Sequence, residues 1–226
     1  MADLAGRPMI EHVYRRATAA ALVQTVVVAT DDPRIAAAVE GFGGLAVMTR
    51  PSHPSGTDRI AEVAAALPCR LIVNVQGDEP LIEPETIDAA VAPLLADPAL
   101  EMCTLSRPFA DPGEFASPHV VKVVTDSRGY ALYFSRAAIP HPRTGPPCPG
   151  AARAHVGLYA YRRDVLLRLA ALPPSLLEEV EALEQLRALA HGIGIRVVDT
   201  RYPSIGVDTP DDLDRVRQLL TAASRT

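Results

Sequence analysis

The sequence of 226 residues contains no tryptophan, three cysteines, a single lysine and no long hydrophobic run. Cys69, Cys103 and Cys148 are odd in number and lack the spacing of a metal site, so we expect a reducing compartment and thiols without a functional role. The uncharged run at 17–30 is shorter than the roughly 20 residues of a membrane helix. Charged residues near the start interrupt the apolar core of a signal peptide. We therefore predict a cytoplasmic protein.

A large excess of charge of one sign is also missing. The formal net charge is −5, with 22% charged and 48% hydrophobic residues. This balance argues against a broad positively charged surface that binds nucleic acid or a membrane. The length and the apolar content suit a single domain over residues 1–226.

The first half of the chain alternates strand and helix patterns. Apolar runs predict strands at 24–30, 45–49 and 70–75, and periodic apolar residues predict helices at 31–44, 55–67 and 84–96. Pro93 should bend or break the third helix. Side chains expected to face inward from the second and third helices are Ile60, Val63, Ala64, Leu67, Ile87, Val91, Leu94 and Leu95. This order predicts an α/β fold with a Rossmann-like, doubly wound, mostly parallel sheet.

The pattern changes in the second half. Strands are expected at 101–107, 155–162 and 195–199, with a β-hairpin in 119–136 that turns at 126–129. The proline-rich stretch at 139–153 predicts a loop. Helices are expected at 174–192 and from Pro210 onward. We therefore expect an inserted, hairpin-rich subregion at about 107–162.

Polar residues follow the predicted strand at 70–75, where a parallel sheet presents ligand sites. Gln76, Gly77, Asp78 and Glu79 come in succession there. Gly77 allows a close backbone approach, and the Asp78 carboxylate is a hard oxygen ligand suited to Mg²⁺. The alternative is a solvated turn with a capping aspartate, because acidic residues are common in loops.

A second carboxylate, Asp208, precedes the C-terminal helix. Thr209 and Asp212 are explained as the cap of that helix, with Pro210 in its first turn. Capping does not require Asp208. Asp78 and Asp208 could share one magnesium ion, as two-carboxylate sites do when phosphates complete the shell.

Three further stretches carry candidate binding groups. Ser55, Gly56 and Arg59 at a helix start offer backbone N–H groups and a guanidinium to an anion, although a plain capped helix explains them equally well. Polar residues at the strand ends, such as Arg136, His155 and Tyr159, are on their own more often core or surface groups. Acidic and amide side chains along 178–185 read as a solvated helical stripe.

Taken in order, six segments resemble the 3-deoxy-manno-octulosonate cytidylyltransferase family, also called CMP-KDO synthetases. They are "MTRPSHPSGTDRIAEV", "NVQGDEPLI", "VVKVV…GYALYFSRAAIP", "HVGLYAY", "LEQLR" and "GVDTPDDLDRVR". The resemblance covers nearly the whole chain, from about residue 3 to 217. It implies transfer of CMP from CTP to an eight-carbon sugar acid with release of diphosphate, for lipopolysaccharide biosynthesis, in a cytoplasmic homodimer.

The resemblance also implies roles for individual residues. Asp78 and Asp208 would be catalytic and would hold Mg²⁺. The nucleotide would contact Ser55, Gly56, Arg59 and Gln76. The sugar acid would contact Gln76, Arg136, His155, Tyr159, Glu184 and Gln185, with Arg136 as the clamp for its carboxylate. The subregion at about 107–162 would serve sugar binding and dimerisation.

The sequence departs from the family pattern in two places. Family members begin with a strand and a loop of the form I-P-A-R-x-x-S-x-R-x-x-x-K that wraps the triphosphate, whereas the match here begins after that loop, and Lys122 lies in a hairpin where it cannot replace the loop's basic residues. Because a first strand is central in a doubly wound sheet, we expect a gap in the core, unpaired backbone on its neighbours, low stability and weak or no activity. Ala154 also stands where the family tends to have arginine, with Arg153 one place back.

Other functions remain open from the sequence. Related cytidylyltransferases act on an 8-amino version of the sugar or on sialic acid. A truncated or non-catalytic homologue could keep only a sugar-acid pocket, although it would not need both Asp78 and Asp208. A generic nucleotide-binding domain fits the periodicity but leaves the six ordered motifs unexplained.

Overall fold

The structure is a computed structural model that describes residues 2–145, 150–202, 205–207 and 209–223. The chain divides into two compact units. Unit 1 comprises residues 1–69, 74–88 and 203–226, and unit 2 comprises 70–73 and 89–202. The expectation of a single domain stays a prediction.

Unit 1 contains a short hairpin, a parallel strand pair and four helices among its described residues. They are β1 (Asp3–Leu4), β2 (Arg7–Pro8), α1 (Met9–Ala19), β3 (Val28–Thr30), α2 (Pro33–Gly41), β4 (Ala46–Met48), α3 (Gly56–Ala66) and α9 (Pro210–Ala223). β1 and β2 pair antiparallel, and β3 pairs in parallel with β4. Within the described residues β3 is bonded to β4 alone.

Local chemistry sets the helix starts in unit 1. Asp32 stands before Pro33, and its Oδ1 accepts the N–H of Arg34 at 2.8 Å. Ser55 caps α3 in the same manner through the N–H of Asp58 at 3.2 Å. Such caps satisfy N–H groups that a helix leaves unpaired, and each contributes about 1 kcal/mol.

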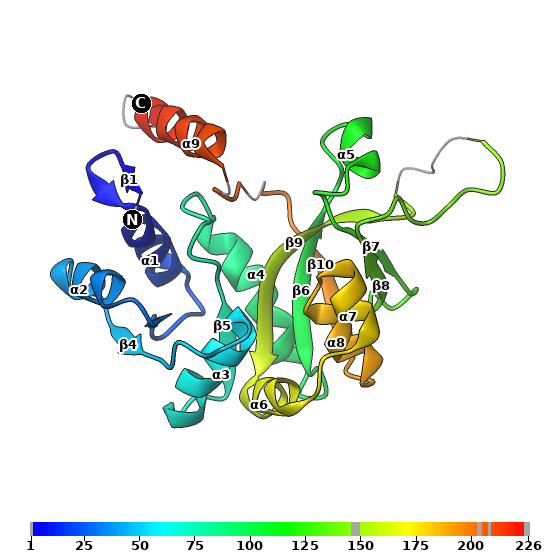
Figure 1. The fold of residues 1–226 in the computed structure, drawn as a ribbon. Coiled ribbons are helices and arrows are strands. Elements are labelled where there is room, and N and C mark those ends of the chain that lie inside the picture. The colour runs from blue at the N-terminus through cyan, green and yellow to red at the C-terminus, as the bar shows by residue number, and fades with distance from the viewer. Residues whose placement is uncertain (1, 146–149, 203–204, 208, 224–226) are drawn as a thin grey trace. The chain divides into compact units, whose positions relative to one another are not determined.

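Unit 2 is built on a larger sheet. Its elements are β5 (Leu71–Asn74, whose last residue belongs to unit 1), α4 (Pro84–Ala96, whose first residues belong to unit 1), β6 (Met102–Arg107), α5 (Pro112–Ala116), β7 (Lys122–Thr125), β8 (Ala131–Ser135), β9 (Arg153–Arg162), α6 (Arg163–Ala171), α7 (Leu176–Glu181), α8 (Gln185–Ala190) and β10 (Ile195–Asp199). The strand order is β10-β6-β9-β7-β8, and β5 pairs with β9. Figure 1 shows β6, β9 and β10 side by side. β10 and β6 are parallel, whereas β6–β9, β7–β9 and β7–β8 are antiparallel.

The core of unit 2 lies where the sheet meets its helices. Leu105, Leu158 and Ile195 of the sheet are completely buried or nearly so, as are Leu166 of α6 and Leu186 of α8. Burial of each such side chain contributes roughly 1.5–3 kcal/mol relative to exposure. This core fixes β8, β9 and α8, which carry the predicted sugar-binding residues.

The α/β class and most predicted elements are confirmed. The strands at 101–107, 155–162 and 195–199 and the hairpin turning at 126–129 form as β6, β9, β10 and β7–β8. The single helix predicted at 174–192 is wrong, because the chain forms α7 and α8 with Ala182 between them at φ 51°. Pro93 does not break α4, which runs unbroken to Ala96. Leu95 is 51% exposed and does not face inward as predicted, whereas Ile87 and Leu94 are buried.

In the part of the chain that the structure describes, no helix combines the length and the apolar character that a membrane crossing requires.

Candidate active site

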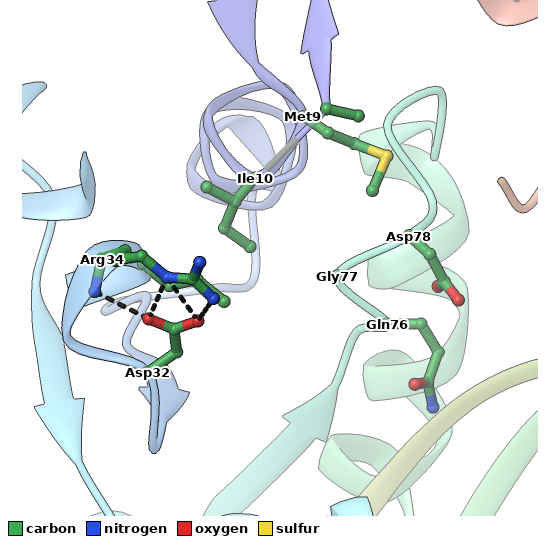
Figure 2. A pocket seen from close by; sticks show the side chains of 9 residues that line it. Met9, Ile10, Asp32, Arg34, Gln76, Gly77 and Asp78 are labelled. Carbon is green, nitrogen blue, oxygen red and sulfur yellow. Dashed lines mark hydrogen bonds and ion pairs between the residues drawn. The ribbon is translucent and has the colours of Figure 1, made fainter. Parts of the chain in front are cut away.

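Gln76, Gly77 and Asp78 lie just after β5, as the sequence predicted, and belong to unit 1. They line a pocket of about 380 Å³ together with Ala2, Met9, Ile10, Asp32, Arg34 and Ile35. Figure 2 shows the side chains of Gln76 and Asp78 extending to the same side of their loop. Gln76 is exposed and Asp78 is half-buried.

Asp32 and Arg34 form an ion pair on the opposite wall of this pocket (Figure 2). Arg34 Nη2 lies 2.6 Å from Asp32 Oδ2, and Arg34 also donates from its backbone N–H. These hydrogen bonds lower the pKa of Asp32 to about 2. Asp32 is therefore ionised at neutral pH and serves as a helix cap, which the sequence reading recognised only as a helix start.

The C-terminal segment of unit 1 is bonded to the loop that carries Asp78. The N–H of Val207 donates to the backbone carbonyl of Asp78 at 2.9 Å. Asp208 follows Val207 but lies outside the described residues, so its predicted role stays a prediction. The predicted cap of α9 is confirmed, because Asp212 accepts the N–H and hydroxyl of Thr209 and donates its own N–H to Thr209 Oγ1.

The predicted nucleotide contacts at the start of α3 are held by neighbours in unit 1. Ser55 Oγ donates to Asp58 Oδ2 at 2.6 Å. Arg59 donates to Thr49 Oγ1 at 2.6 Å and pairs with Asp31 Oδ2 at 3.1 Å. Asp31 and Thr49 follow β3 and β4, respectively. The guanidinium of Arg59 is thus positioned next to the ends of both parallel strands, while Gly56 stays exposed.

Arg136 of unit 2 lies just after β8 and is held by the connection between α7 and α8. Its Nε donates to the carbonyl of Glu181 at 2.8 Å, and its Nη1 and Nη2 donate to the carbonyls of Pro118 and Ala182 at 3.2 and 3.4 Å. A guanidinium has five N–H groups, so one N–H on each Nη has no partner among the described residues. Two such N–H groups match the two oxygens of a carboxylate.

Two charged side chains fix the main chain at Arg136. Glu181 accepts the N–H of Arg136 at 2.9 Å and the hydroxyl of Ser135 at 2.6 Å. Lys122 is completely buried, and its ammonium donates to the carbonyls of Arg136, Ser117 and Val120. Burial lowers the pKa of Lys122. Lys122 is therefore committed to holding this strand end, in agreement with the expectation that it cannot replace the phosphate-binding residues of the family.

His155 and Tyr159 lie on one face of β9, with ring centroids 5.5 Å apart. His155 Nε2 lies 2.9 Å from Thr104 Oγ1, whose hydroxyl donates to the carbonyl of Leu158 at 2.9 Å. The single proton of that hydroxyl is thereby used, so His155 donates from Nε2, and its Nδ1 is an acceptor. Burial lowers the pKa of His155 to about 3, which keeps the ring neutral.

Gln185 and Glu184 begin α8, close to Tyr159. Gln185 is 6% exposed, and its Nε2 is buried without a hydrogen-bond partner in the described structure. An unpaired buried amide costs about 1–3 kcal/mol, so it favours a ligand that supplies an acceptor. Burial and the charges of Tyr161 and Glu184 raise the pKa of Tyr159, which keeps its phenol protonated.

The predicted residues therefore form two groups. Gln76 and Asp78 share a pocket in unit 1, and Ser55, Gly56 and Arg59 lie at the start of α3 in the same unit. Arg136, His155, Tyr159, Glu184 and Gln185 belong to unit 2. Sequence reasoning missed Thr104 and did not assign Lys122 to the support of Arg136. Its interpretation of the 178–185 stripe as solvated is wrong, because Glu181 binds Ser135 and Arg136 and Glu178 and Gln185 are buried. No cluster of three or more histidine, cysteine or acidic residues that could hold a metal is found among the described residues.

Cys69 and Cys103 are free thiols. Cys103 is completely buried, and burial raises its pKa to about 12, so it stays protonated at neutral pH. Cys148 lies outside the described residues.

The sequence was compared with known families and proteins. The family model of cytidylyltransferases matches residues 1–196. The 3-deoxy-manno-octulosonate cytidylyltransferase of Syntrophotalea carbinolica is 57% identical over 224 residues, which cover 96% of this chain and 89% of the relative. The chain belongs to the 3-deoxy-manno-octulosonate cytidylyltransferase family. The family member of Geobacter sulfurreducens is 55% identical and covers 97% of this chain and 92% of its own length.

Solved structures agree with this family. A CMP:2-keto-3-deoxy-manno-octonic acid synthetase complexed with CTP has a TM-score of 0.93 and 46% identity, covering 98% of this chain and 91% of its own. The 4-diphosphocytidyl-2C-methyl-D-erythritol synthase of Anaerococcus prevotii has a TM-score of 0.65 at 15% identity over 97% of this chain and 91% of its own, and supports the fold alone. The predicted Rossmann-like nucleotidyltransferase fold is thus confirmed.

Proposed function

We propose that the protein transfers CMP from CTP to 3-deoxy-manno-octulosonate and releases diphosphate, as a step of lipopolysaccharide biosynthesis. The hydroxyl at the anomeric carbon attacks the α-phosphorus, the bond to the β-phosphate oxygen breaks, and the hydroxyl proton is lost. The observation that carries this proposal is the 57% identity to a 3-deoxy-manno-octulosonate cytidylyltransferase over 96% of the chain. The solved relative with bound CTP supports the nucleotide.

The nucleotide and a metal ion are assigned to unit 1. Ser55, Gly56, Arg59 and Gln76 would contact CTP. Asp78 and Asp208 would hold Mg²⁺, which would neutralise phosphate charge when bound. The hard oxygens of Asp78 fit this ion, and two carboxylates suffice because Mg²⁺ keeps waters and phosphate oxygens in its shell. The bond from Val207 N–H to the Asp78 carbonyl supports the pairing, since it joins the two chain segments one residue before Asp208.

The sugar acid is assigned to unit 2. Arg136 would clamp the carboxylate with the two N–H groups that do not donate to carbonyls of the described residues. The Nδ1 of neutral His155 would accept a sugar hydroxyl, and the buried amide of Gln185 would donate to one. Tyr159 and Glu184 complete the set. Because a buried amide without an acceptor is costly, a hydroxyl-rich ligand satisfies this surface better than an apolar one.

Enzymatic assay tests this function. Diphosphate release from CTP should require both Mg²⁺ and 3-deoxy-manno-octulosonate, and 8-amino-octulosonate and sialic acid serve as competing substrates. Equal or faster turnover of either competitor would assign a different sugar. Sugar-acid binding without diphosphate release would favour the non-catalytic alternative.

The metal assignment has its own test. Asp78→Ala should abolish turnover and Mg²⁺ binding in calorimetric titration, while the melting temperature changes little. Asp211→Ala, an exposed carboxylate on α9, is the matched control and should behave as wild type. Mg²⁺ binding that survives in the Asp78 variant would remove this residue from the site.

We further propose that the protein is a cytoplasmic homodimer. Apolar side chains stand exposed on β8 and α7 of unit 2: Leu132 is 63%, Leu176 74% and Val180 75% exposed. Exposed apolar groups of this kind favour association, and a second copy supplies an equivalent surface. Light scattering should give a dimer mass, and Leu176→Glu with Val180→Glu should give a monomer. A monomeric wild type would refute this surface.

A further inference from the structure

Gly157 stands in the interior of β9, between His155 and Tyr159 in the sequence. The alternating burial of β9 places Ala154, Val156, Leu158 and Ala160 in the core and leaves residues 153, 155, 157 and 159 half-exposed. β9 lies in the middle of its sheet and pairs with β6, β7 and β5. β9 is antiparallel to β6 and β7, and an antiparallel sheet can leave one face uncovered, where a ligand can bind.

The backbone conformation does not require a glycine at this position. A Cβ built on Gly157 meets no heavy atom within 4 Å, and its φ lies outside the left-handed region. The register shifts by two residues between Thr104 and Leu105, so Gly157 and Leu158 form a bulge in β9. The φ of Gly157 lies outside the left-handed region, so this bulge does not demand glycine. Glycine inside a strand weakens it, and it otherwise indicates the close approach of a ligand or of another backbone.

The surroundings of the empty space fit a hydroxylated ring. His155 and Tyr159 flank Gly157 with two rings whose centroids are 5.5 Å apart. His155 supplies an acceptor at Nδ1, because its Nε2 is engaged with Thr104. No described residue bonds the Tyr159 hydroxyl. The bare backbone of Gly157 is thus close along the chain to two polar groups, so the C–H face of a sugar would approach the backbone while its hydroxyls bond to them.

We propose that Gly157 is a specificity-determining residue whose missing side chain makes room for the ring of the sugar acid. This inference rests on the proposed function and extends it to a residue that touches the substrate through shape alone. A methyl group added here enters space that the protein leaves empty, so we expect it to hinder binding of the substrate without destabilising the folded protein. One misplaced methyl or methylene in a binding site changes discrimination by roughly 10- to 200-fold.

The test compares wild type with Gly157→Ala, Gly157→Val and the control Gly41→Ala. Gly41 ends α2, where an added Cβ also meets nothing within 4 Å, so the control adds the same methyl away from the sugar residues. Diphosphate release is measured with saturating CTP and Mg²⁺ and varied sugar acid, then with varied CTP. Calorimetric titration of the sugar acid and thermal melting are run on all four proteins.

We expect KM and Kd for the sugar acid to rise roughly tenfold or more with alanine and further with valine. KM for CTP should stay within about twofold, and the melting temperature should be unchanged or higher because both residues favour strands more than glycine does. Unchanged sugar affinity in both variants would overturn the inference while leaving the proposed function intact. A lowered melting temperature with unchanged affinity would show that protein atoms fill this space. A wild type that neither binds nor converts the sugar acid would overturn the proposed function itself.

Discussion

The neutral state of His155 makes the stability of the protein sensitive to acid. Its ring contacts Phe134 at 4.9 Å and Tyr159 at 5.5 Å between centroids, and its Nε2 is bonded to Thr104. Burial lowers its pKa from 6.5 to about 3. Between these two values the unfolded chain binds a proton that the folded chain does not. The free energy of unfolding is therefore unaffected by the protonation of His155 above pH 6.5, and it decreases as the pH falls from 6.5 toward 3.

The size of this loss follows from the two pKa values. Each pH unit in the window costs about 1.36 kcal/mol, so lowering the pH from 7.5 to 5 removes about 2 kcal/mol of unfolding free energy. A folded-state pKa about one unit higher would change this figure by only about 0.1 kcal/mol, because His155 would still be almost fully neutral at pH 5.

Urea unfolding at pH 7.5 and pH 5 measures the effect. His155→Gln removes the titrating ring and keeps a polar side chain, so wild type should lose about 2 kcal/mol more than the variant between the two pH values. Equal losses in both proteins would refute the reasoning. An NMR titration gives an independent check, since one histidine should show no protonation at pH 5, and its resonance should be missing in His155→Gln.

Three further predictions concern groups that hold the candidate site. Glu178→Gln should lower the free energy of unfolding by about 3–5 kcal/mol in urea, since it leaves the buried guanidinium of Arg187 without its carboxylate partner at 2.5 Å; a loss below about 1 kcal/mol would show that this pair is solvated. Thr209→Ala should cost about 1 kcal/mol through loss of the α9 cap, and an unchanged melting temperature would contradict the cap. Lys122→Arg should lower the melting temperature and raise KM for the sugar acid without changing KM for CTP; wild-type values would mean that the three carbonyls tolerate a planar donor.

The elements that the sequence predicted well have local signals. The β-branched and apolar runs that became β5, β6 and β10 specify strands by composition, and the turn at 126–129 specifies a hairpin. The helices α1 and α6 were missed although their signal is also local. In α6, Val165, Leu166 and Leu169 are buried at helical spacing. Closer attention to periodicity would have found both.

The break between α7 and α8 has no local signal. The spacing of apolar and acidic residues continues through 174–192, which is why one helix was predicted. In the structure the carbonyls of Glu181 and Ala182 accept hydrogen bonds from Arg136, and Ala182 takes a left-handed conformation. A distant guanidinium thus satisfies carbonyls at the end of α7 that a continuous helix would have bonded internally. Tertiary contacts here override the helical propensity of the segment.

The same distinction applies to the candidate site. Residues with reactive or ligand-binding groups, such as Asp78 and Arg136, were found from their motifs. The groups that hold them were not, because Lys122 and Arg136 are 14 residues apart, Arg136 and Glu181 are 45 apart, and Thr104 and His155 are 51 apart. The two longer separations exceed any window used to read periodicity, and the ammonium bond of Lys122 to the Arg136 carbonyl has no sequence pattern of its own.

Lys122 shows what such a support requires chemically. It is one lysine among 22 basic residues, so arginine meets nearly every other need for positive charge in this chain. A compact ammonium has three donors that can diverge toward three carbonyls, whereas a guanidinium directs its five donors within one plane. The three carbonyls around Lys122 come from the 117–120 loop and from Arg136. Lysine therefore fits this position better than arginine because of the geometry of its donors. By binding the carbonyl of Arg136, Lys122 also holds in place the residue proposed to clamp the substrate.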